Sequence, residues 1–321
     1  MGSNFIKYIL ARHADWEVVN LDKLTYAGNL ENLREIENSP NYSFVKGDIA
    51  SAQDVEKALG NGVDKIINYA AETHVDRSIL APDAFIKTDV FGTYTLLEAA
   101  RQHNVAQYIQ ISTDEVFGSI KTGAFDEQSP FEPNSPYAAS KAGADHLCRA
   151  YFKTYNLPVI VSHSCNFFGP NQYPEKLIPL FITNLLENKK VPVYGAGDQR
   201  REWIFTEDHC KAVETIMEKG EAGEVYNIGT GFEKTNLEIT RFILQELGFG
   251  EDRIEYVKDR PGHDWRYAVN AEKLRGLGWQ PGIDWEEGLR RTIKWYQENE
   301  SWWKKIKSGE YLEYYKQQYG K

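Results

Sequence analysis

Five side chains suited to proton transfer stand close together in the middle of the sequence. Thr113, Asp114 and Glu115 follow a strand-like apolar run, and Tyr137 and Lys141 open a segment with helical spacing. Residues four apart share one face of a helix, so the phenol of Tyr137 and the ammonium of Lys141 can act as a unit. A hydroxyl, two carboxyl groups, a phenol and an amine are suited to acid–base chemistry on a small molecule. The sequence therefore predicts an acid–base site made of these residues.

The elements expected to position this site alternate between strands and helices. Strands are expected at 18–21, 42–46, 65–69, 108–112 and 158–162, and helices at 4–12, 54–59, 88–103 and 136–155. This alternation predicts an α/β fold, a doubly wound parallel sheet with helices on both faces. Such sheets bind ligands outside the carboxyl ends of their strands, which is where the acid pair falls.

The second half of the chain has a looser rhythm. Helices are expected at 174–187 and 205–219, and strands at 191–194, 224–228 and 254–257. A segment of this kind predicts a smaller mixed α/β lobe that covers the carboxyl ends of the strands. The aromatic residues at 302–319 are expected to pack against this lobe.

Composition excludes several classes of protein. The 321 residues are 41% hydrophobic and 26% charged, as in an ordinary globular protein with two domains or lobes. A net charge of −10 without a basic block argues against nucleic acid, and no apolar run is long enough to cross a membrane. We see no signal peptide, metal-type spacing or histidine cluster. Three scattered cysteines, Cys148, Cys165 and Cys210, therefore predict a cytoplasmic, metal-free protein with reduced thiols.

The start of the sequence departs from the usual dinucleotide-binding pattern. In that pattern a strand runs into a Gly-rich turn, and the turn opens the first helix. Here Gly2 directly precedes the first helical segment, yet Asp22 follows 20 residues later, close to the spacing of the carboxylate that binds the adenine ribose. We interpret Gly2 as the last glycine of a Rossmann-like loop, with the first strand and most of the Gly-rich loop lacking. A chain beginning at Met1 is expected to be less stable and to bind NAD weakly.

Several stretches together carry a resemblance to one family. They lie at 22–29, 70–78, 112–116, 137–141, 174–180, 226–229 and 259–264. A Tyr-x-x-x-Lys spacing alone is common, but preceded by Thr-Asp-Glu and followed by Asp-Arg-Pro-Gly-His-Asp it is specific. Over essentially its whole length the sequence resembles the dTDP-glucose 4,6-dehydratases of the extended short-chain dehydrogenase/reductase family.

The resemblance implies an NAD-dependent lyase that oxidises a nucleotide-linked hexose at C4, removes water across C5–C6 and reduces C6. It implies that Tyr137 takes the C4 hydroxyl proton, with a phenolate favoured by Lys141, which also reaches the nicotinamide ribose. Thr113 would hydrogen-bond the C4 oxygen. Glu115 would remove the C5 proton while a protonated Asp114 protonates the departing C6 hydroxyl, so their pKa values must differ.

The resemblance also implies two sets of binding residues. The cofactor set comprises Gly2, Asp22, Lys23, Leu24, Thr25, Asp48, Ile49, Tyr69, Ala70, Ala71, Thr88, Tyr137 and Lys141. The substrate set comprises Glu72, Thr73, Thr113, Asn166, Lys176, Leu177, Pro192, Tyr194, Arg201, Asn227, Arg260 and His263. A carboxylate at position 22 favours NAD over NADP, and arginine suits a diphosphate because its donors can bridge two oxygens.

A division into domains and a mode of association follow from the same resemblance. Residues 1–164 with about 202–232 would bind NAD, and about 165–201 with 233–321 would bind the nucleotide sugar. The helices expected at 88–103 and 136–155 are those that family members pair across a homodimer, as a four-helix bundle.

Three residues depart from the family pattern. Phe167 stands where a second asparagine usually follows Asn166, so one polar contact to the cofactor is expected to be lost. Phe117 replaces a tyrosine, and Glu202 replaces an aspartate before Trp203; both changes are mild.

Other functions remain open at this point. The chain could be another nucleotide-sugar dehydratase, or a 4-epimerase, although sugar 4-epimerases lack the Asp-Glu pair. It could also be a non-catalytic nucleotide-sugar-binding remnant, because the cofactor loop is incomplete. The base of the nucleotide is not fixed by any residue singled out above.

Overall fold

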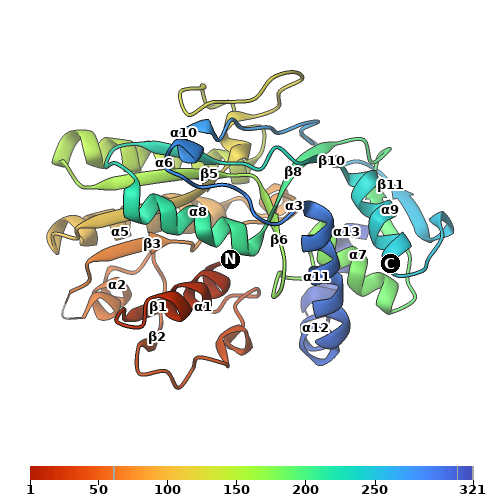
Figure 1. The fold of residues 1–321 in the computed structure, drawn as a ribbon, viewed down its shortest axis with the longest axis horizontal. Helices are drawn as coiled ribbons and strands as arrows, with labels where there is room; N and C mark the ends of the chain where they lie inside the picture. The colour runs from red at the N-terminus through yellow and green to blue at the C-terminus, as the bar shows by residue number, and fades with distance from the viewer. Residues whose placement is uncertain (61, 309, 320–321) are drawn as a thin grey trace.

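The computed structural model describes residues 1–60, 62–308 and 310–319, and it shows two lobes side by side (Figure 1). The larger lobe holds the parallel sheet between two layers of helices. The smaller lobe gathers helices from the second half of the chain around short strands. The two-lobe α/β architecture predicted from the sequence is therefore confirmed.

The larger lobe is built on parallel strands in the order β3-β4-β5-β9. Their bounds are Lys65–Asn68, Gln107–Thr113, Val159–Ser164 and Val225–Ile228. Strands β1 (Val18–Asp22) and β2 (Tyr42–Lys46) pair in parallel in a separate ladder. The first element is helix α1 (Gly2–Arg12), and within the described residues no ladder hydrogen bonds join β1 to β3. The lack of a first strand stays an expectation.

Alternating side chains of β4 bury into two separate cores. Ile109 and Ile111 face the core shared with α1 and α8 (Thr206–Lys219), whereas Tyr108 faces the opposite core. The helices packed on that opposite side are α2 (Ala52–Leu59), α5 (Thr93–Gln102) and α6 (Pro136–Tyr155). Burial on both faces is what a parallel sheet requires, and it explains the apolar run of β4.

The helix expected at 88–103 begins earlier and is not uniform. Short helices α3 (Val75–Leu80) and α4 (Asp83–Phe85) lead into a π-helical segment, η2 (Ile86–Gly92), before α5 begins. Gly92 lies against Ile49, and a Cβ at Gly92 would stand 2.6 Å from the Ile49 Cδ1 atom. π-helical turns often occur at functional sites, and this one carries the predicted cofactor residue Thr88.

The smaller lobe contains strands that the sequence pattern did not reveal. The three-stranded sheet β10-β8-β6 is made of Glu233–Thr235, Arg200–Phe205 and Asn166–Phe168. Two of these strands have three residues, and β8 begins with charged residues, so none shows an alternating apolar pattern. The strands expected at 191–194 and 254–257 are confirmed as β7 (Val191–Tyr194) and β11 (Ile254–Val257), and the structure shows that they pair in parallel.

Helices of the smaller lobe surround a core rich in aromatic residues. The main ones are α7 (Leu177–Leu186), α9 (Asn236–Glu246), α11 (Trp285–Glu298), α12 (Glu300–Ile306) and α13 (Glu310–Tyr319). Short segments complete the chain at η1 (Leu30–Leu33), η3 (Asp114–Phe117), η4 (Glu251–Arg253) and α10 (Glu272–Gly276). Trp302, Trp303 and Tyr311 are buried in this core, which confirms the packing predicted for the aromatic carboxyl-terminal segment.

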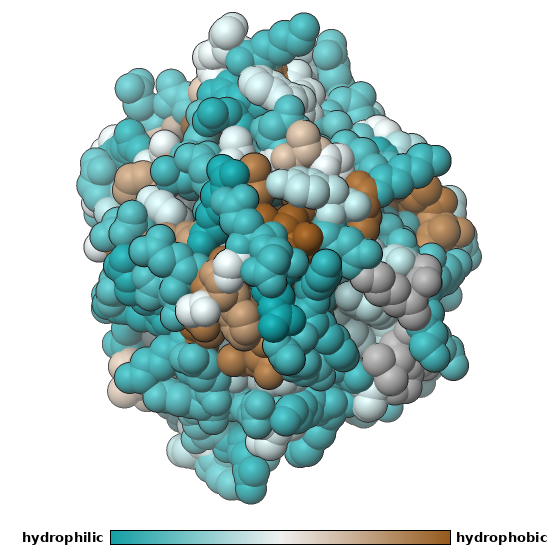
Figure 2. All heavy atoms as spheres, turned by 90° about the vertical axis from the view of Figure 1, so that its right-hand side faces the viewer, coloured by the Kyte–Doolittle hydropathy of each residue, from teal (hydrophilic) through white to brown (hydrophobic). Residues whose placement is uncertain are grey.

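The end of the smaller lobe presents a mostly hydrophilic surface with separate apolar areas (Figure 2). None of the helices in the described ranges has the length and apolar character needed to span a bilayer. The three cysteines are buried and free of disulfides.

Candidate active site

The five catalytic candidates meet at the carboxyl end of β4. Thr113 ends this strand and caps η3, because its Oγ1 accepts a hydrogen bond from the Glu115 N–H at 3.2 Å. This tight turn places Asp114 and Glu115 directly beyond the sheet. Tyr137 and Lys141 lie in the first turns of α6, and the Lys141 Nζ donates to the Ile111 carbonyl of β4 at 2.8 Å. The structure thus brings together the residues that sequence spacing only suggested.

Helix α6 begins at a well-defined point, which fixes Tyr137. Ser135 is its N-cap and accepts from the Ala138 N–H at 3.1 Å, and Pro136 occupies the first helical position. Proline suits that position because its N–H would have no helical partner. A helix anchored in this way holds the phenol of Tyr137 in one place against the strand.

The two carboxyl groups have different environments. Asp114 is 1% exposed, its Oδ1 accepts from Thr113 Oγ1 at 3.2 Å, and its Oδ2 has no partner. Burial first, and then the neighbouring carboxylates of Glu115 and Glu202, raise the pKa of Asp114 well above its ordinary range. These surroundings favour the neutral acid of Asp114, and its Oδ2 is unengaged among the described residues.

Glu115 is surrounded by cations instead. Burial raises its pKa, while Arg260, Arg201 and Lys176 lower it and the Asp264 carboxylate opposes them. Three positive groups stabilise the ionised form, so Glu115 is the better placed of the pair to accept a proton.

The environment of Tyr137 differs from the expectation. Lys141 was expected to acidify the phenol, but its Nζ donates to the Ile111 carbonyl. Burial, followed by the carboxylates of Glu115 and Asp89, raises the pKa of Tyr137 well above its ordinary value, with only Thr113 among the leading contributions acting to lower it. The predicted lowering of the Tyr137 pKa is wrong, because burial and the negative charges around the phenol outweigh the effect of the Lys141 amine.

Predicted substrate residues with positive charge lie on the smaller-lobe side of the site. Arg201 is buried, and its guanidinium donates to the carbonyls of Arg200 and Asp264 at 2.7 and 2.9 Å. Arg260 NH1 donates to Asp76 Oδ1 at 3.3 Å. His263 Nδ1 lies 2.6 Å from Asp259 Oδ1, and burial together with Arg260 lowers the pKa of His263 to about 4. His263 is thus neutral at physiological pH.

The other predicted substrate residues come from both lobes. Lys176 donates to the Thr73 carbonyl, and the Glu72 N–H donates to Asp89 Oδ1 at 2.9 Å. Asn166 opens β6 with a buried Oδ1 that has no partner, and Leu177 begins α7 and packs on the smaller-lobe core.

Two predicted substrate residues are covered by neighbouring segments. Pro192 is buried in β7, and Asn227 in β9 donates to the Phe125 carbonyl at 3.2 Å. Across the described part of the chain, no hydrogen bond or ion pair joins either side chain to the five catalytic candidates.

The predicted cofactor residues form two groups. At the end of β1, Asp22 Oδ1 accepts from the Leu24 N–H at 2.7 Å, and Lys23 pairs with Asp48 at 2.8 Å. In the loop that continues through Thr25, Leu24 has a φ of 55°, which is strained for a residue other than glycine. Its backbone lies so close to Gly28 that a Cβ there would stand 2.5 Å from the Leu24 Cα.

The second group lies nearer the catalytic pair. Ala70 and Ala71 follow β3, the Tyr69 hydroxyl is buried without a partner, and Gly2 packs against the Tyr69 side chain. Ile49 is buried against Gly92 of the η2 segment, and Thr88, which lies within that segment, is half-buried. The exposed Asp22 carboxylate at one end and the buried, unsatisfied Tyr69 hydroxyl at the other fit a dinucleotide among the described residues.

Comparison with known proteins identifies the family. The family model described as GDP-mannose 4,6 dehydratase matches residues 1–292. The chain belongs to this family. It is 48% identical to a dTDP-glucose 4,6-dehydratase from Streptomyces niveus over 313 residues, which cover 96% of this chain and 93% of the relative. It is 44% identical to the Escherichia coli dTDP-glucose 4,6-dehydratase, with coverage of 99% and 96%.

Solved structures in and around the GDP-mannose 4,6 dehydratase family agree with the fold. DesIV, a dTDP-glucose 4,6-dehydratase from Streptomyces venezuelae with NAD and TYD bound, matches with a TM-score of 0.93 and 48% identity, covering 95% of this chain and 96% of that one. A UDP-glucose 4-epimerase from Thermus thermophilus in complex with NAD matches at 0.86 with 28% identity, covering 93% and 96%. The fold is shared with epimerases, so the site must separate the two activities.

Several residues of this family member were missed by sequence reasoning. Tyr267 OH donates to Asp264 Oδ2 at 2.6 Å and lies 3.4 Å from Glu115 Oε2, and the Arg201 guanidinium covers the Tyr267 ring. Tyr319 stacks against Tyr194 with ring centroids 6.2 Å apart. Tyr267 stands just beyond the 259–264 stretch, which offered a signal, whereas nothing in the sequence placed Tyr319 near this site.

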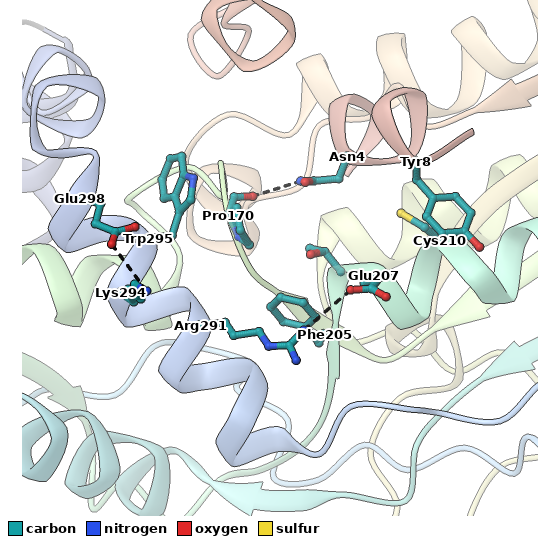
Figure 3. A pocket seen from close by; sticks show the side chains of 11 residues that line it. Asn4, Tyr8, Pro170, Phe205, Glu207, Cys210, Arg291, Lys294, Trp295 and Glu298 are labelled. Atoms are coloured by element: carbon teal, nitrogen blue, oxygen red, sulfur yellow. Dashed lines mark hydrogen bonds and ion pairs between the residues drawn. The ribbon is translucent and has the colours of Figure 1, made fainter. Parts of the chain in front are cut away.

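Two other features of the chain lie apart from these residues. A pocket of about 450 Å³ opens between α1, α8 and α11, with ion pairs joining Arg291 to Glu207 and Lys294 to Glu298 (Figure 3). None of the predicted site residues lines it. It forms a separate surface feature.

The second feature is a group of potential metal ligands. His13, Glu214 and Glu218 lie together, but Glu214 already accepts from Tyr8 and Arg12 at 2.6 and 2.9 Å and lies 2.8 Å from His13 Nε2. These contacts tie α1 to α8.

Proposed function

We propose that this protein is an NAD-dependent dTDP-glucose 4,6-dehydratase that forms dTDP-4-keto-6-deoxyglucose. One observation carries the proposal: the adjacent Asp114 and Glu115 at the end of β4 have separated electrostatic environments. Removal of water across C5–C6 needs one group that gives a proton and one that takes a proton. An epimerase oxidises and reduces a single carbon and has no use for such a pair.

Oxidation at C4 uses the residues at the junction of β4 and α6. Tyr137 accepts the C4 hydroxyl proton, Thr113 hydrogen-bonds the same oxygen, and Lys141 is held by the Ile111 carbonyl beside them. NAD would be held by the predicted cofactor residues, among them Asp22, Thr88 and Lys141, and when bound would supply the acceptor that takes up the C4 hydride and later returns it to C6. Burial and the neighbouring carboxylates raise the pKa of Tyr137, so a nearby positive charge would favour the phenolate that takes the proton.

Elimination then follows from the acidity of C5 beside a ketone. Glu115 takes the C5 proton, the C5 electron pair forms the C5–C6 double bond, and the C6–O bond breaks. Asp114 gives its proton to the departing oxygen, which leaves as water. The unpartnered Oδ2 of Asp114 suits the role of the acid, and the cations around Glu115 suit the role of the base. The opposite assignment would fit neither environment.

Three positively charged side chains of the site would anchor the nucleotide sugar. Arg201, Arg260 and Lys176 all act on Glu115 electrostatically, so the three cations lie within reach of one ligand. Guanidinium groups bind diphosphate oxygens through paired donors. We assign residues 1–164 with about 202–232 to NAD, and about 165–201 with 233–321 to the sugar nucleotide.

We further propose a homodimer formed by the helices α5 and α6, located in the cytoplasm where free cysteines stay reduced. Large apolar side chains that are about half exposed gather on α3, η2, α5 and α6: Ile79, Leu80, Ile86, Phe91, Tyr94 and Tyr155. An apolar surface of this kind is typical of a buried interface. The double variant I86E/F91E should be monomeric by light scattering, whereas Y256E, on the remote strand β11, should leave the association unchanged; a dimeric I86E/F91E would refute this interface.

The function is tested by incubating the purified protein, supplied with NAD, with glucose linked to each common nucleoside diphosphate. The 4-keto-6-deoxy product is expected from dTDP-glucose, with transient NADH absorbance during turnover. The matched control is Glu115→Gln, which should still oxidise C4 but release no product. Formation of the C4 epimer, or no reaction with any substrate of the panel, would refute the proposal.

A further inference from the structure

Asp76 is a buried carboxylate to which the proposed chemistry gives no task. It lies in the first turn of α3 and is 5% exposed. Arg260 NH1 donates to its Oδ1 at 3.3 Å, and Tyr194 OH donates to its Oδ2 at 3.1 Å. A buried carboxylate is strongly unfavourable unless its oxygens have partners. Here one oxygen is bound from the 259–264 loop and the other from the end of β7.

We propose that Asp76 is a positioning residue that fixes Arg260 and Tyr194 for binding the diphosphate and base of the nucleotide. The inference rests on the proposed function, because Arg260 is assigned there to the nucleotide sugar and Tyr194 belongs to the substrate set that the family resemblance implies. Asp76 itself belongs to the larger lobe, whereas both partners belong to the smaller one. Asp76 therefore links the two lobes at the nucleotide site.

The contact leaves Arg260 able to bind a further anion. Its guanidinium carries five N–H donors, and the pairing with Asp76 engages one nitrogen while the buried Nε has no partner. Arg260 also acts on the Glu115 carboxylate. Asp76 thus fixes one nitrogen of the Arg260 guanidinium and leaves the others for the nucleotide.

Tyr194 is held on three sides. Its hydroxyl donates to Asp76 and accepts from Gln318 Nε2 at 2.6 Å, and its ring stacks on Tyr319 of α13. Burial, followed by Asp76, raises the pKa of Tyr194 to about 12, so it remains a phenol donor. A ring fixed in this way keeps its orientation toward an adjoining base. Asp76 therefore also determines the position of an aromatic wall of the site.

Nucleotide binding tests the inference without turnover. We would measure the Kd of dTDP by calorimetry for the wild type, Asp76→Ala, Asp76→Asn and the control Asp83→Asn, whose exposed carboxyl lies on the neighbouring helix α4. Loss of both charge-assisted contacts should raise the Kd about tenfold, or about 1.4 kcal/mol, in Asp76→Ala. Asp76→Asn keeps the shape of the side chain and one acceptor, so its Kd should lie between those of the wild type and Asp76→Ala. Asp83→Asn should have the Kd of the wild type.

A purely structural role would predict another pattern. Misfolding would weaken NAD and dTDP binding alike, whereas positioning weakens dTDP binding while the NAD affinity is kept, and raises KM more than it lowers kcat. Wild-type dTDP affinity in Asp76→Ala overturns the inference; if that variant does not fold, wild-type affinity in Asp76→Asn does so. Failure of the wild type itself to bind dTDP would instead contradict the proposed function.

Discussion

Replacement of Asp114 by asparagine separates the steps of the proposed reaction. Asparagine keeps the shape of the side chain and the oxygen that accepts from Thr113 at 3.2 Å, but it has no acidic proton for the leaving hydroxyl. A positioned general acid contributes about 10²- to 10⁴-fold. At 1.36 kcal/mol for each factor of ten, elimination should therefore lose about 2.7–5.4 kcal/mol of transition-state stabilisation. Oxidation at C4 should proceed, since Thr113, Tyr137 and Lys141 are unchanged.

The assay is a single turnover in D₂O with absorbance and mass spectrometry. Asp114→Asn should accumulate NADH and a 4-keto hexose that gains deuterium at C5, because Glu115 still exchanges that proton. Glu115→Gln should accumulate NADH without deuterium at C5, which makes it the matched control. Elimination at the wild-type rate in Asp114→Asn would refute the role of Asp114 as the acid.

Stability provides an independent check that Asp114→Asn folds. Folding raises the pKa of Asp114, so ionisation of this group in the unfolded chain lowers the stability of the native state progressively above the ordinary carboxyl pKa. The neutral asparagine escapes this loss. The variant should therefore be at least as stable as the wild type at about pH 8, and the difference should shrink at acid pH, where both forms are neutral. A clearly lower melting temperature at about pH 8 would show that the electrostatic description of Asp114 is wrong.

Three further substitutions test the surroundings of the site. Burial raises the pKa of Asp89 from 3.8 to about 6, so Asp89→Asn should stabilise the protein by about 2 kcal/mol at neutral pH after the loss of one hydrogen bond. Below the ordinary carboxyl pKa only the lost hydrogen bond remains, so the variant should there be less stable by about 1 kcal/mol; urea unfolding at several pH values measures both. Gly28→Ala should weaken NAD binding about tenfold or more and leave dTDP binding intact, because a Cβ at 2.5 Å from the Leu24 backbone must displace the loop. Calorimetry with both ligands measures this, and a wild-type NAD affinity in the variant would contradict it. Ser135→Ala removes the cap of α6 and should cost about 1 kcal/mol in urea unfolding, and no loss would show that the cap is dispensable.

Local sequence patterns were sufficient for most elements of the larger lobe, but not for the segmented helix that precedes and includes α5. The strand at 42–46 and the helix at 136–155 have the bounds expected from the sequence, because apolar periodicity and the Ser135–Pro136 entry signal are local properties. The same holds for the acid pair after β4, since a residue at the end of a parallel strand must face the ligand edge. The resemblance then supplied residues such as Arg201 and Arg260, which no local pattern marks as binding groups.

What only the tertiary structure decided is the electrostatics and the pairing of distant segments. The sequence could not show that Asp114 has an unpartnered oxygen, or that Lys141 donates to the Ile111 carbonyl and leaves Tyr137 with a raised pKa. Nor could it place Asp76 against side chains 118 and 184 residues away. The physical reason is that residue type and spacing fix which groups are available, whereas desolvation and contact depend on all the elements that pack around them.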